Sequence, residues 1–283
     1  MQNWNPRLDG TNGSGGSALA GENSIADGGA YKFDQPVIHT IGFSDLRDVL
    51  DKGMADFIAM PTHVIFLCLI YPIVILISAR IYAGYEVVWL AFPLLAGYTL
   101  IGPLVATGMY ELSRRREQGL DISRAKAFHV LQRHATRSIG VLGALLMVIY
   151  FAWLWAAWII YEKYFGTALP ASITDFAFQV FTTPAGWSLI TVGSAVGLGF
   201  AIVVLTLSVV SFPMLIARDV GVGTAIQTSI RAVIANPVTM MAWGLTVACA
   251  LLIGSLPFFV GLAVVLPVLG HATWHLYRKV VEF

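Results

Sequence analysis

Two histidines near the end of the chain have a spacing that could support chemistry. His271 and His275 lie four residues apart in the stretch PVLGHATWHLYRK, residues 267–279. On an α-helix they share one face about one turn apart, as two ligands of one metal ion must. Together with His63 they offer nitrogens to a metal ion, or an axial ligand to haem. His63, His271 and His275 are therefore the weak metal or haem candidates of this sequence.

The surroundings of the two histidines favour a different interpretation. Neither H-E-x-x-H nor C-x-x-C-H occurs, and no acidic residue or cysteine lies at a spacing that would complete a ligand set. The same stretch carries residue types typical of a helix that meets lipid headgroups, namely Trp274, Tyr277, Arg278 and Lys279. We therefore expect a membrane exit here, with bound lipids but no metal or haem cofactor.

Nothing else in the sequence argues for an enzyme. A nucleophile elbow, a P-loop, a Rossmann glycine fingerprint and paired catalytic carboxylates are all missing from it. The formal net charge of +1 does not support nucleic-acid binding, which usually requires a strongly basic face. The sequence therefore predicts no catalytic residues and no nucleic-acid partner.

The composition predicts a membrane protein. Of the 283 residues, 57% are hydrophobic and 12% are charged, whereas roughly 25% are charged in an ordinary soluble domain. A helix needs about 20 apolar residues to cross the hydrocarbon core. We predict an all-α polytopic membrane helix bundle with about six spans, at 57–79, 88–110, 138–160, 187–213, 238–255 and 258–277.

The placement of Lys and Arg predicts the orientation. Nearly all the cations that flank the predicted spans fall on one side, which leaves Arg80 and Lys163 on the other. Cytoplasmic loops carry the excess of Lys and Arg. We therefore place both termini in the cytoplasm.

Two short segments have the features of interfacial amphipathic helices. In residues 43–57, Phe43, Leu46, Leu50, Met54 and Phe57 follow a helical rhythm, and the acidic residues, Asp56 among them, occupy other faces. Farther along, the SITD sequence at 172–175 has capping-box spacing before an apolar segment. Both segments predict helices that lie along the membrane surface.

An internal repeat suggests how the spans are arranged. GPLVATGMYELSRR (102–115) and LPVLGHATWHLYRK (266–279) share a proline, apolar residues, an aromatic residue, a leucine and a basic pair in register. We therefore predict a bundle of repeated two-helix hairpins. The predicted parts are a polar Gly/Ser-rich tail (1–40) and a transmembrane domain (41–283), which contains hairpins 57–110, 138–217 and 238–277 and a cytoplasmic basic loop, 111–137.

The predicted spans are short of groups that could move ions. Residues 138–160, 188–217 and 238–270 contain no Asp, Glu, Lys, Arg or His, whereas transporters and proton pumps usually carry ionisable groups within their spans. The fourth span instead carries small residues that let helices approach closely, Gly193, Gly197 and Gly199. These glycines predict helix packing rather than chemistry.

Four motifs together resemble a known family. GPLVATGMYELSRRREQG, SVVSFPMLIARDVG, TSIRAVIANP and PVLGHATWHLYRK are similar to the uncharacterised bacterial integral-membrane proteins of domain-of-unknown-function family 2189, over roughly residues 40–280. The resemblance implies a multi-pass inner-membrane protein and supplies no activity to carry over. The motif residues are Pro103, Glu111, Arg114, Arg115, Pro213, Asn236, Pro237, Pro267, His271, Trp274, His275 and Arg278.

Two functions from different classes follow from these patterns. The tail has a composition expected to be disordered in isolation, and we expect a partner to order it. An ordered tail and neutral spans together favour a non-catalytic accessory or assembly subunit of a larger inner-membrane complex, most concretely a respiratory-chain complex. Its partners would be lipids and other integral membrane subunits. The alternative is a small-molecule or ion transporter or channel with repeat symmetry, which the paired hairpins and the prolines favour.

Overall fold

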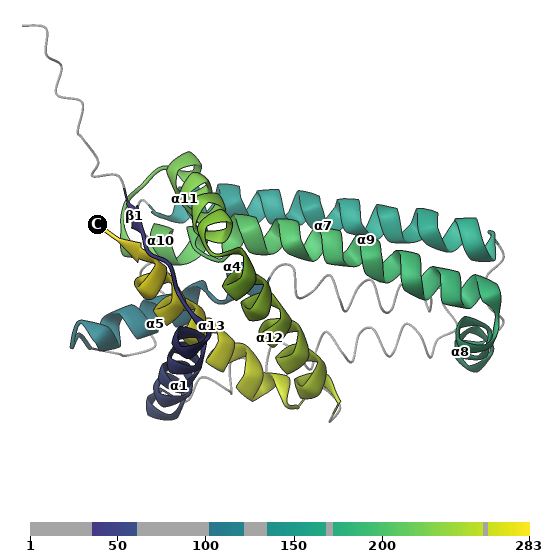
Figure 1. Ribbon diagram of the computed structural model, residues 1–283, viewed down its shortest axis with the longest axis horizontal. Helices are drawn as coiled ribbons and strands as arrows, with labels where there is room; N and C mark the ends of the chain where they lie inside the picture. Colours follow the sequence, from purple (N-terminus) through teal and green to yellow (C-terminus); the bar gives the residue numbers. More distant parts are fainter. Residues whose placement is uncertain (1–35, 61–101, 122–134, 168–171, 257–259) are drawn as a thin grey trace, which may run out of the picture. The chain divides into compact units, whose positions relative to one another are not determined.

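The computed structural model describes residues 36–60, 102–121, 135–167, 172–256 and 260–283. Most of the predicted tail and of the first two predicted spans, 57–79 and 88–110, lies outside these residues. His63 and most of the predicted basic loop lie outside them as well. The description that follows concerns the remaining elements (Figure 1).

Four helices form the apolar part of the described chain: α7 (Ala135–Phe165), α9 (Pro184–Ser208), α10 (Ser211–Ala217) and α12 (Pro237–Ser255). They give three segments that are long and apolar enough to cross a membrane: Arg137–Phe165 in α7, Pro184–Ala217 in α9 and α10, and Pro237–Ser255 in α12. They confirm the predicted spans 138–160, 187–213 and 238–255. The all-α membrane bundle that the composition predicts is confirmed with them.

Helices α7 and α9 pack side by side along their length (Figure 1). The rings of Trp153 and Phe200 meet edge to face, with their centroids 5.6 Å apart. A Cβ atom at Gly197 would lie 3.1 Å from Cη2 of Trp153, so a larger residue there would press on the ring. No described atom lies within 4 Å of such an atom at Gly193 or Gly199. Of the three packing glycines, Gly197 is the one whose neighbour the structure describes.

Helix α8 (Ile173–Thr182) begins where the SITD sequence predicts a helix. The backbone N–H of Asp175 donates a hydrogen bond of 3.0 Å to Ser172 Oγ, which satisfies one of the free donors at the helix start. Thr183 caps α9 in the same way, and Pro184 follows as the first residue of that helix. Two successive caps therefore turn the chain from α8 into α9.

The predicted amphipathic segment 43–57 forms α1 (Phe43–Ala59), but a different face is buried. The buried residues are Leu46, Val49, Gly53 and Asp56, whereas Phe43 and Met54, which the pattern placed on the apolar face, are exposed. The reason is the close packing of α1 on α13 (Leu262–Val280). A Cβ atom at Gly53 would lie 2.8 Å from the backbone oxygen of Val268, so only glycine permits this contact.

The motif at 102–115 forms two helices, α4 (Gly102–Val105) and α5 (Thr107–Glu117). Helix α5 packs against α13 and ends before Gly119, whose φ of 65° requires a left-handed backbone. The predicted basic loop 111–137 therefore begins as a helix, because α5 buries one face against α13. Helix α13 covers most of the predicted span 258–277, with Pro267 inside it, yet it is not among the described helices that are apolar enough to cross a membrane.

A small antiparallel β-sheet joins the two ends of the described chain. Strand β1 (Val37–Ile38) pairs with β2 (Val281–Glu282), so that Val37 lies opposite Glu282 and Ile38 opposite Val281. Strands of two residues carry no periodic signal that a sequence pattern could reveal. Asn236, which ends α11 (Val222–Ala235), holds the chain that leads out of β1. It accepts a hydrogen bond from the Ile41 N–H and donates one to the His39 carbonyl oxygen.

Candidate functional site

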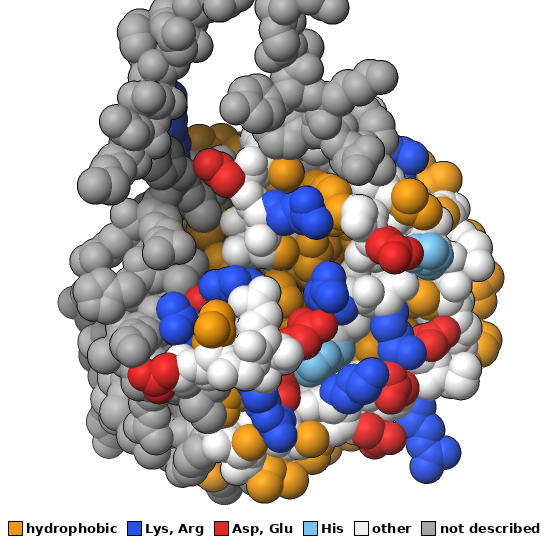
Figure 2. Space-filling view, turned by 90° about the vertical axis from the view of Figure 1, so that its left-hand side faces the viewer, with side chains coloured by type: hydrophobic (Ala, Val, Ile, Leu, Met, Phe, Trp, Pro, Cys, Tyr) orange, Lys and Arg blue, Asp and Glu red, His pale blue; other side chains and the backbone are white. Residues whose placement is uncertain are grey.

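Many ionisable residues of the described chain gather at the end that α1, α5 and α13 form. Figure 2 shows acidic, basic and histidine side chains interleaved on this end of the molecule. Three elements far apart in the sequence meet here, because α13 packs against both α1 and α5. Gly53 allows the closest approach, and Asp56 lies on the same face of α1 about one turn farther on. The packing therefore carries a carboxylate to the two histidines of α13.

Asp56 is the centre of a buried polar network. Its Oδ2 atom accepts a hydrogen bond of 2.5 Å from Ser113 Oγ and lies 2.9 Å from His275 Nε2. Its Oδ1 atom accepts a hydrogen bond of 2.5 Å from Arg116 Nη1. Burial by itself would raise the pKa of the Asp56 carboxyl, but the hydrogen bonds from His275 and Ser113 outweigh it and lower that pKa. The carboxylate is therefore ionised, and Nε2 of His275 carries the proton between them.

His271 lies deeper than His275 and is completely buried. Its Nδ1 atom lies 2.7 Å from Ser113 Oγ and 3.9 Å from Asp56 Oδ2. Burial lowers the pKa of the imidazole from 6.5 to about 4, although the charge of Asp56 and the backbone of Met109 oppose this shift. Because Ser113 donates its single proton to Asp56, the Nδ1 atom of neutral His271 donates to Ser113. The other ring nitrogen, Nε2, has no hydrogen-bond partner among the described residues.

The arrangement of these groups does not match a nucleophilic triad. A triad needs a histidine between the hydroxyl and the carboxylate, so that the imidazole can take the proton. Here the hydroxyl of Ser113 lies between Asp56 and His271, and Ser113 is completely buried. Ser113 therefore connects two helices instead of serving as a nucleophile.

The same geometry bears on the metal candidates. His271 and His275 do lie on one face of α13 and both face Asp56. However, the carboxylate contacts His275 directly and also binds Arg116. Over the ranges that the structure covers, no group of three or more His, Cys, Asp or Glu side chains is arranged to hold a metal ion. The two histidines thus make hydrogen bonds within the protein, His275 with Asp56 and His271 with Ser113.

Two further carboxylates are paired beside this network. Glu111 is completely buried and accepts hydrogen bonds from Arg114 and Arg115, at 2.6 to 2.8 Å. Glu117 accepts one from Nε1 of Trp274 at 3.0 Å and one from Nε of Arg278 at 3.1 Å. Glu111 therefore pairs within α5, and Glu117 joins the end of α5 to α13.

The structure brings together seven of the twelve motif residues, Glu111, Arg114, Arg115, His271, Trp274, His275 and Arg278. The prolines lie elsewhere, in or at the start of helices: Pro103 in α4, Pro213 in α10, Pro237 in α12 and Pro267 in α13. Asn236 holds the chain near β1 instead.

Sequence reasoning missed four members of the network, Asp56, Ser113, Arg116 and Glu117. Asp56 was expected on the outer polar face of α1, but it is 5% exposed. The glycine one turn before it was the available signal, because a small residue permits a close helix contact. The other three lie within the motif GPLVATGMYELSRRREQG.

These features define the class of the protein, an all-α integral membrane protein with a polar network at one end of its apolar helices. Residues 91–217 match the family described as "Predicted integral membrane protein (DUF2189)", which confirms the resemblance over this segment; the motifs TSIRAVIANP and PVLGHATWHLYRK lie beyond it. The matched segment contains α5 and α7 to α10, whereas α1 and α13 lie outside it. Neither the curated proteins nor the solved structures yielded a match to the chain.

Proposed function

We propose that this protein is a non-catalytic accessory subunit of a larger complex in a bacterial inner membrane. One observation carries the proposal: the carboxylates of the polar network bind partners within the described chain at one end, and the apolar helices carry no ionisable side chain in their central parts. Asp56, Glu111 and Glu117 are all engaged in hydrogen bonds within the chain. A carboxylate that is paired in this way is not available to carry ions.

The apolar helices expose large side chains that another surface must cover. In the most apolar stretch of α12, 22% is buried inside the described chain. In the corresponding stretch of α7, 28% is buried. Exposed apolar residues lie on all three spans, for example Val148, Leu198 and Leu252. Lipid covers such faces, and so do the helices of other subunits. The proposal assigns part of this surface to other integral membrane subunits.

We assign the particular complex by association. Respiratory-chain complexes are the commonest large assemblies of such a membrane, so one of them is the first partner to test. In the proposed orientation both termini are cytoplasmic, and the tail 1–40 binds the partner from that side. The polar network then lies at the cytoplasmic ends of the helices.

The test is co-purification from native membranes. The full chain, with an affinity tag joined after Phe283 by a flexible linker, is extracted in mild detergent and analysed by mass spectrometry and visible spectroscopy. Stoichiometric recovery of other integral membrane subunits is the expected result, with haem absorbance if the complex is a respiratory oxidoreductase. Recovery of the tagged protein alone and colourless contradicts the proposal and favours the transporter or channel that the repeated hairpins predict.

Three matched variants identify the face that binds the partner. Val148→Trp, Leu198→Trp and Leu252→Trp each add a large apolar side chain at an exposed position on a different span. Fluid lipid accommodates the added volume, whereas a packed helix interface does not. We expect one variant to lose the partner while the other two keep it and serve as controls. Unchanged recovery in all three would exclude these faces as the interface.

A further inference from the structure

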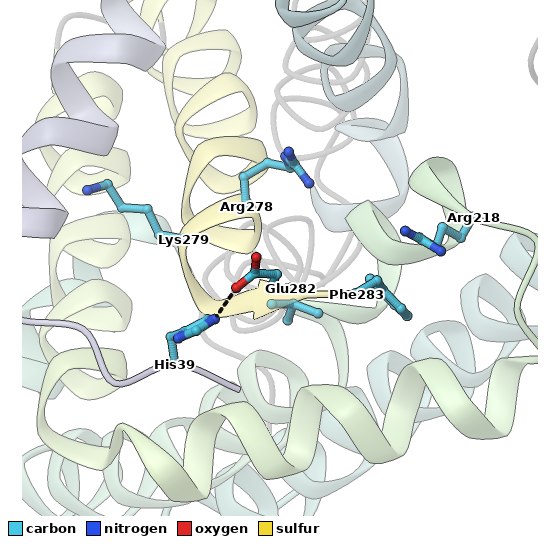
Figure 3. A pocket seen from close by; sticks show the side chains of 7 residues that line it. His39, Arg218, Arg278, Lys279, Glu282 and Phe283 are labelled. Atoms are coloured by element: carbon cyan, nitrogen blue, oxygen red, sulfur yellow. Dashed lines mark hydrogen bonds and ion pairs between the residues drawn. The ribbon is translucent and has the colours of Figure 1, made fainter. Parts of the chain in front are cut away.

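A cavity of about 480 Å³ lies beside the small β-sheet. It is lined chiefly by charged and aromatic side chains near the C-terminal end of the chain, His39, Arg218, Arg278, Lys279, Glu282 and Phe283 (Figure 3). Three of these side chains are permanent cations and one is a carboxylate.

Part of that charge is balanced within the chain. Lys279 Nζ binds Asp45 Oδ1 at 2.6 Å and Asp48 Oδ2 at 3.0 Å, and Figure 3 shows its side chain extending away from Arg218. Glu282 is bound by His39, whose Nε2 lies 2.8 Å from the carboxylate. Asp45 and Asp48 therefore balance the charge of Lys279, and the contact with His39 fixes the position of the Glu282 carboxylate.

Arg218 differs from these paired groups, whereas Arg278 is paired, within the described chain, through its Nε atom only. Arg218 has no ion-pair partner among the described side chains, and its guanidinium lies 4.0 Å above the ring of Phe283. Stacking on a ring fixes the guanidinium plane and leaves its N–H edge available. Arg278 shares its Nε proton with Glu117, and its side chain remains half-exposed. The two guanidiniums extend toward the cavity from different sides, as Figure 3 shows.

The position of Arg218 indicates which anion reaches it. Arg218 follows directly on the apolar segment Pro184–Ala217, which is long enough to cross a membrane. This segment of 34 residues is longer than the hydrocarbon core requires, so its end lies at or beyond the lipid headgroups, where phosphate groups are concentrated. A planar guanidinium binds phosphate through two parallel hydrogen bonds.

We propose that this cavity is a phosphate-binding site in which Arg218 is the main ligand and Arg278 the second. The phosphate belongs either to the headgroup of an anionic phospholipid or to a free phosphate ion, and both sources present the same oxygens to the two guanidiniums. The site does not depend on the accessory role proposed above, because no other subunit contributes to it.

The test compares two probes on the purified full chain in mild detergent. Phosphatidylglycerol is titrated and followed by native mass spectrometry, with phosphatidylcholine as the zwitterionic reference, and inorganic phosphate is titrated by calorimetry. Arg218→Gln removes the main ligand, and Arg218→Lys keeps the charge without the planar fork. The matched control is Arg47→Gln, which removes an equal charge from an exposed position on α1 outside the cavity.

We expect Arg218→Gln to weaken binding by about tenfold, the loss of one bidentate charged contact, and Arg218→Lys to weaken it less. The Arg47→Gln variant should bind as the unaltered protein does. Saturable binding of phosphatidylglycerol alone assigns the site to lipid, and saturable binding of inorganic phosphate assigns it to the free ion. If neither probe binds, or if both bind Arg218→Gln as tightly as the unaltered protein, the proposal is overturned. Equal melting temperatures of the variants show that folding does not cause the difference.

Discussion

The burial of His271 makes the stability of the fold depend on pH in a direction that the structure fixes. The pKa of this imidazole is lowered from 6.5 to about 4. Between these two values the unfolded chain binds a proton that the folded chain does not. The stabilisation is therefore complete above about pH 6.5 and is lost as the pH falls toward about 4. Protonation would place a cation in a site that already holds Arg116 and His275 around Asp56.

The magnitude follows from the interval between the two pKa values. At about 1.4 kcal/mol for each pH unit, the interval from 6.5 to about 4 corresponds to about 3 kcal/mol of unfolding free energy. By pH 5 the expected loss is about 2 kcal/mol. Asp56 does not add to this loss, because the lowered pKa of its carboxyl keeps it ionised at pH 5.

The assay is equilibrium unfolding of the full chain in mixed detergent at pH 7.5, 6.5 and 5. His271→Asn keeps a polar group near Ser113 but removes the titration, so this variant should be less stable at every pH and nearly independent of pH over this range. The control is His39→Gln, which alters an exposed histidine paired with Glu282 and should keep the pH dependence of the unaltered protein. An equally steep loss of stability in His271→Asn would show that another group takes up the proton and would refute the reasoning.

Three other substitutions test the packing and the hydrogen bonds. Gly53→Ala places a Cβ atom 2.8 Å from the backbone of α13 and should lower the unfolding free energy by about 2 kcal/mol or more. The control Gly223→Ala has no described atom within 4 Å of its Cβ atom and should leave the unfolding free energy nearly unchanged. Equal effects of the two substitutions would argue against the close contact. Ser113→Ala leaves Asp56 and His271 without their shared hydroxyl and should cost about 1–3 kcal/mol in the same assay; no loss would mean that the hydroxyl is dispensable. Asn236→Ala removes the hydrogen bonds to residues 39 and 41 and should speed limited proteolysis near β1. The control Thr206→Ala removes a hydroxyl that donates a hydrogen bond to the Ile202 carbonyl oxygen and should not change the cleavage rate there. Identical cleavage rates in the two variants would contradict the role of Asn236.

Much of the fold follows from local sequence patterns. The spans at α7, α9 and α12 are predictable because each apolar run by itself meets the length that the hydrocarbon core requires. The start of α8 is predictable because a cap acts between residues three apart in the chain. Such signals need no knowledge of what packs against the helix.

The candidate site is only partly predictable, because some of its residues come from helices that are distant in the chain. The repeated motifs single out Glu111, Arg114, His271 and His275, and these do lie together. The partner that defines the role of the histidines, Asp56, comes from a helix more than 200 residues earlier in the chain, and periodicity places it on the wrong face of α1. No local pattern encodes which helix will pack against that face.

The sequence by itself determined the class of the protein, because hydropathy, charge placement and caps each depend on one contiguous stretch of the chain. Tertiary structure alone decided that Gly53 brings α1 onto α13, that Ser113 joins Asp56 to His271, and that β1 meets β2 beside the arginine-lined cavity. Each of these contacts joins segments distant in the chain, and its energy depends on a geometry that exists only once the helices have packed.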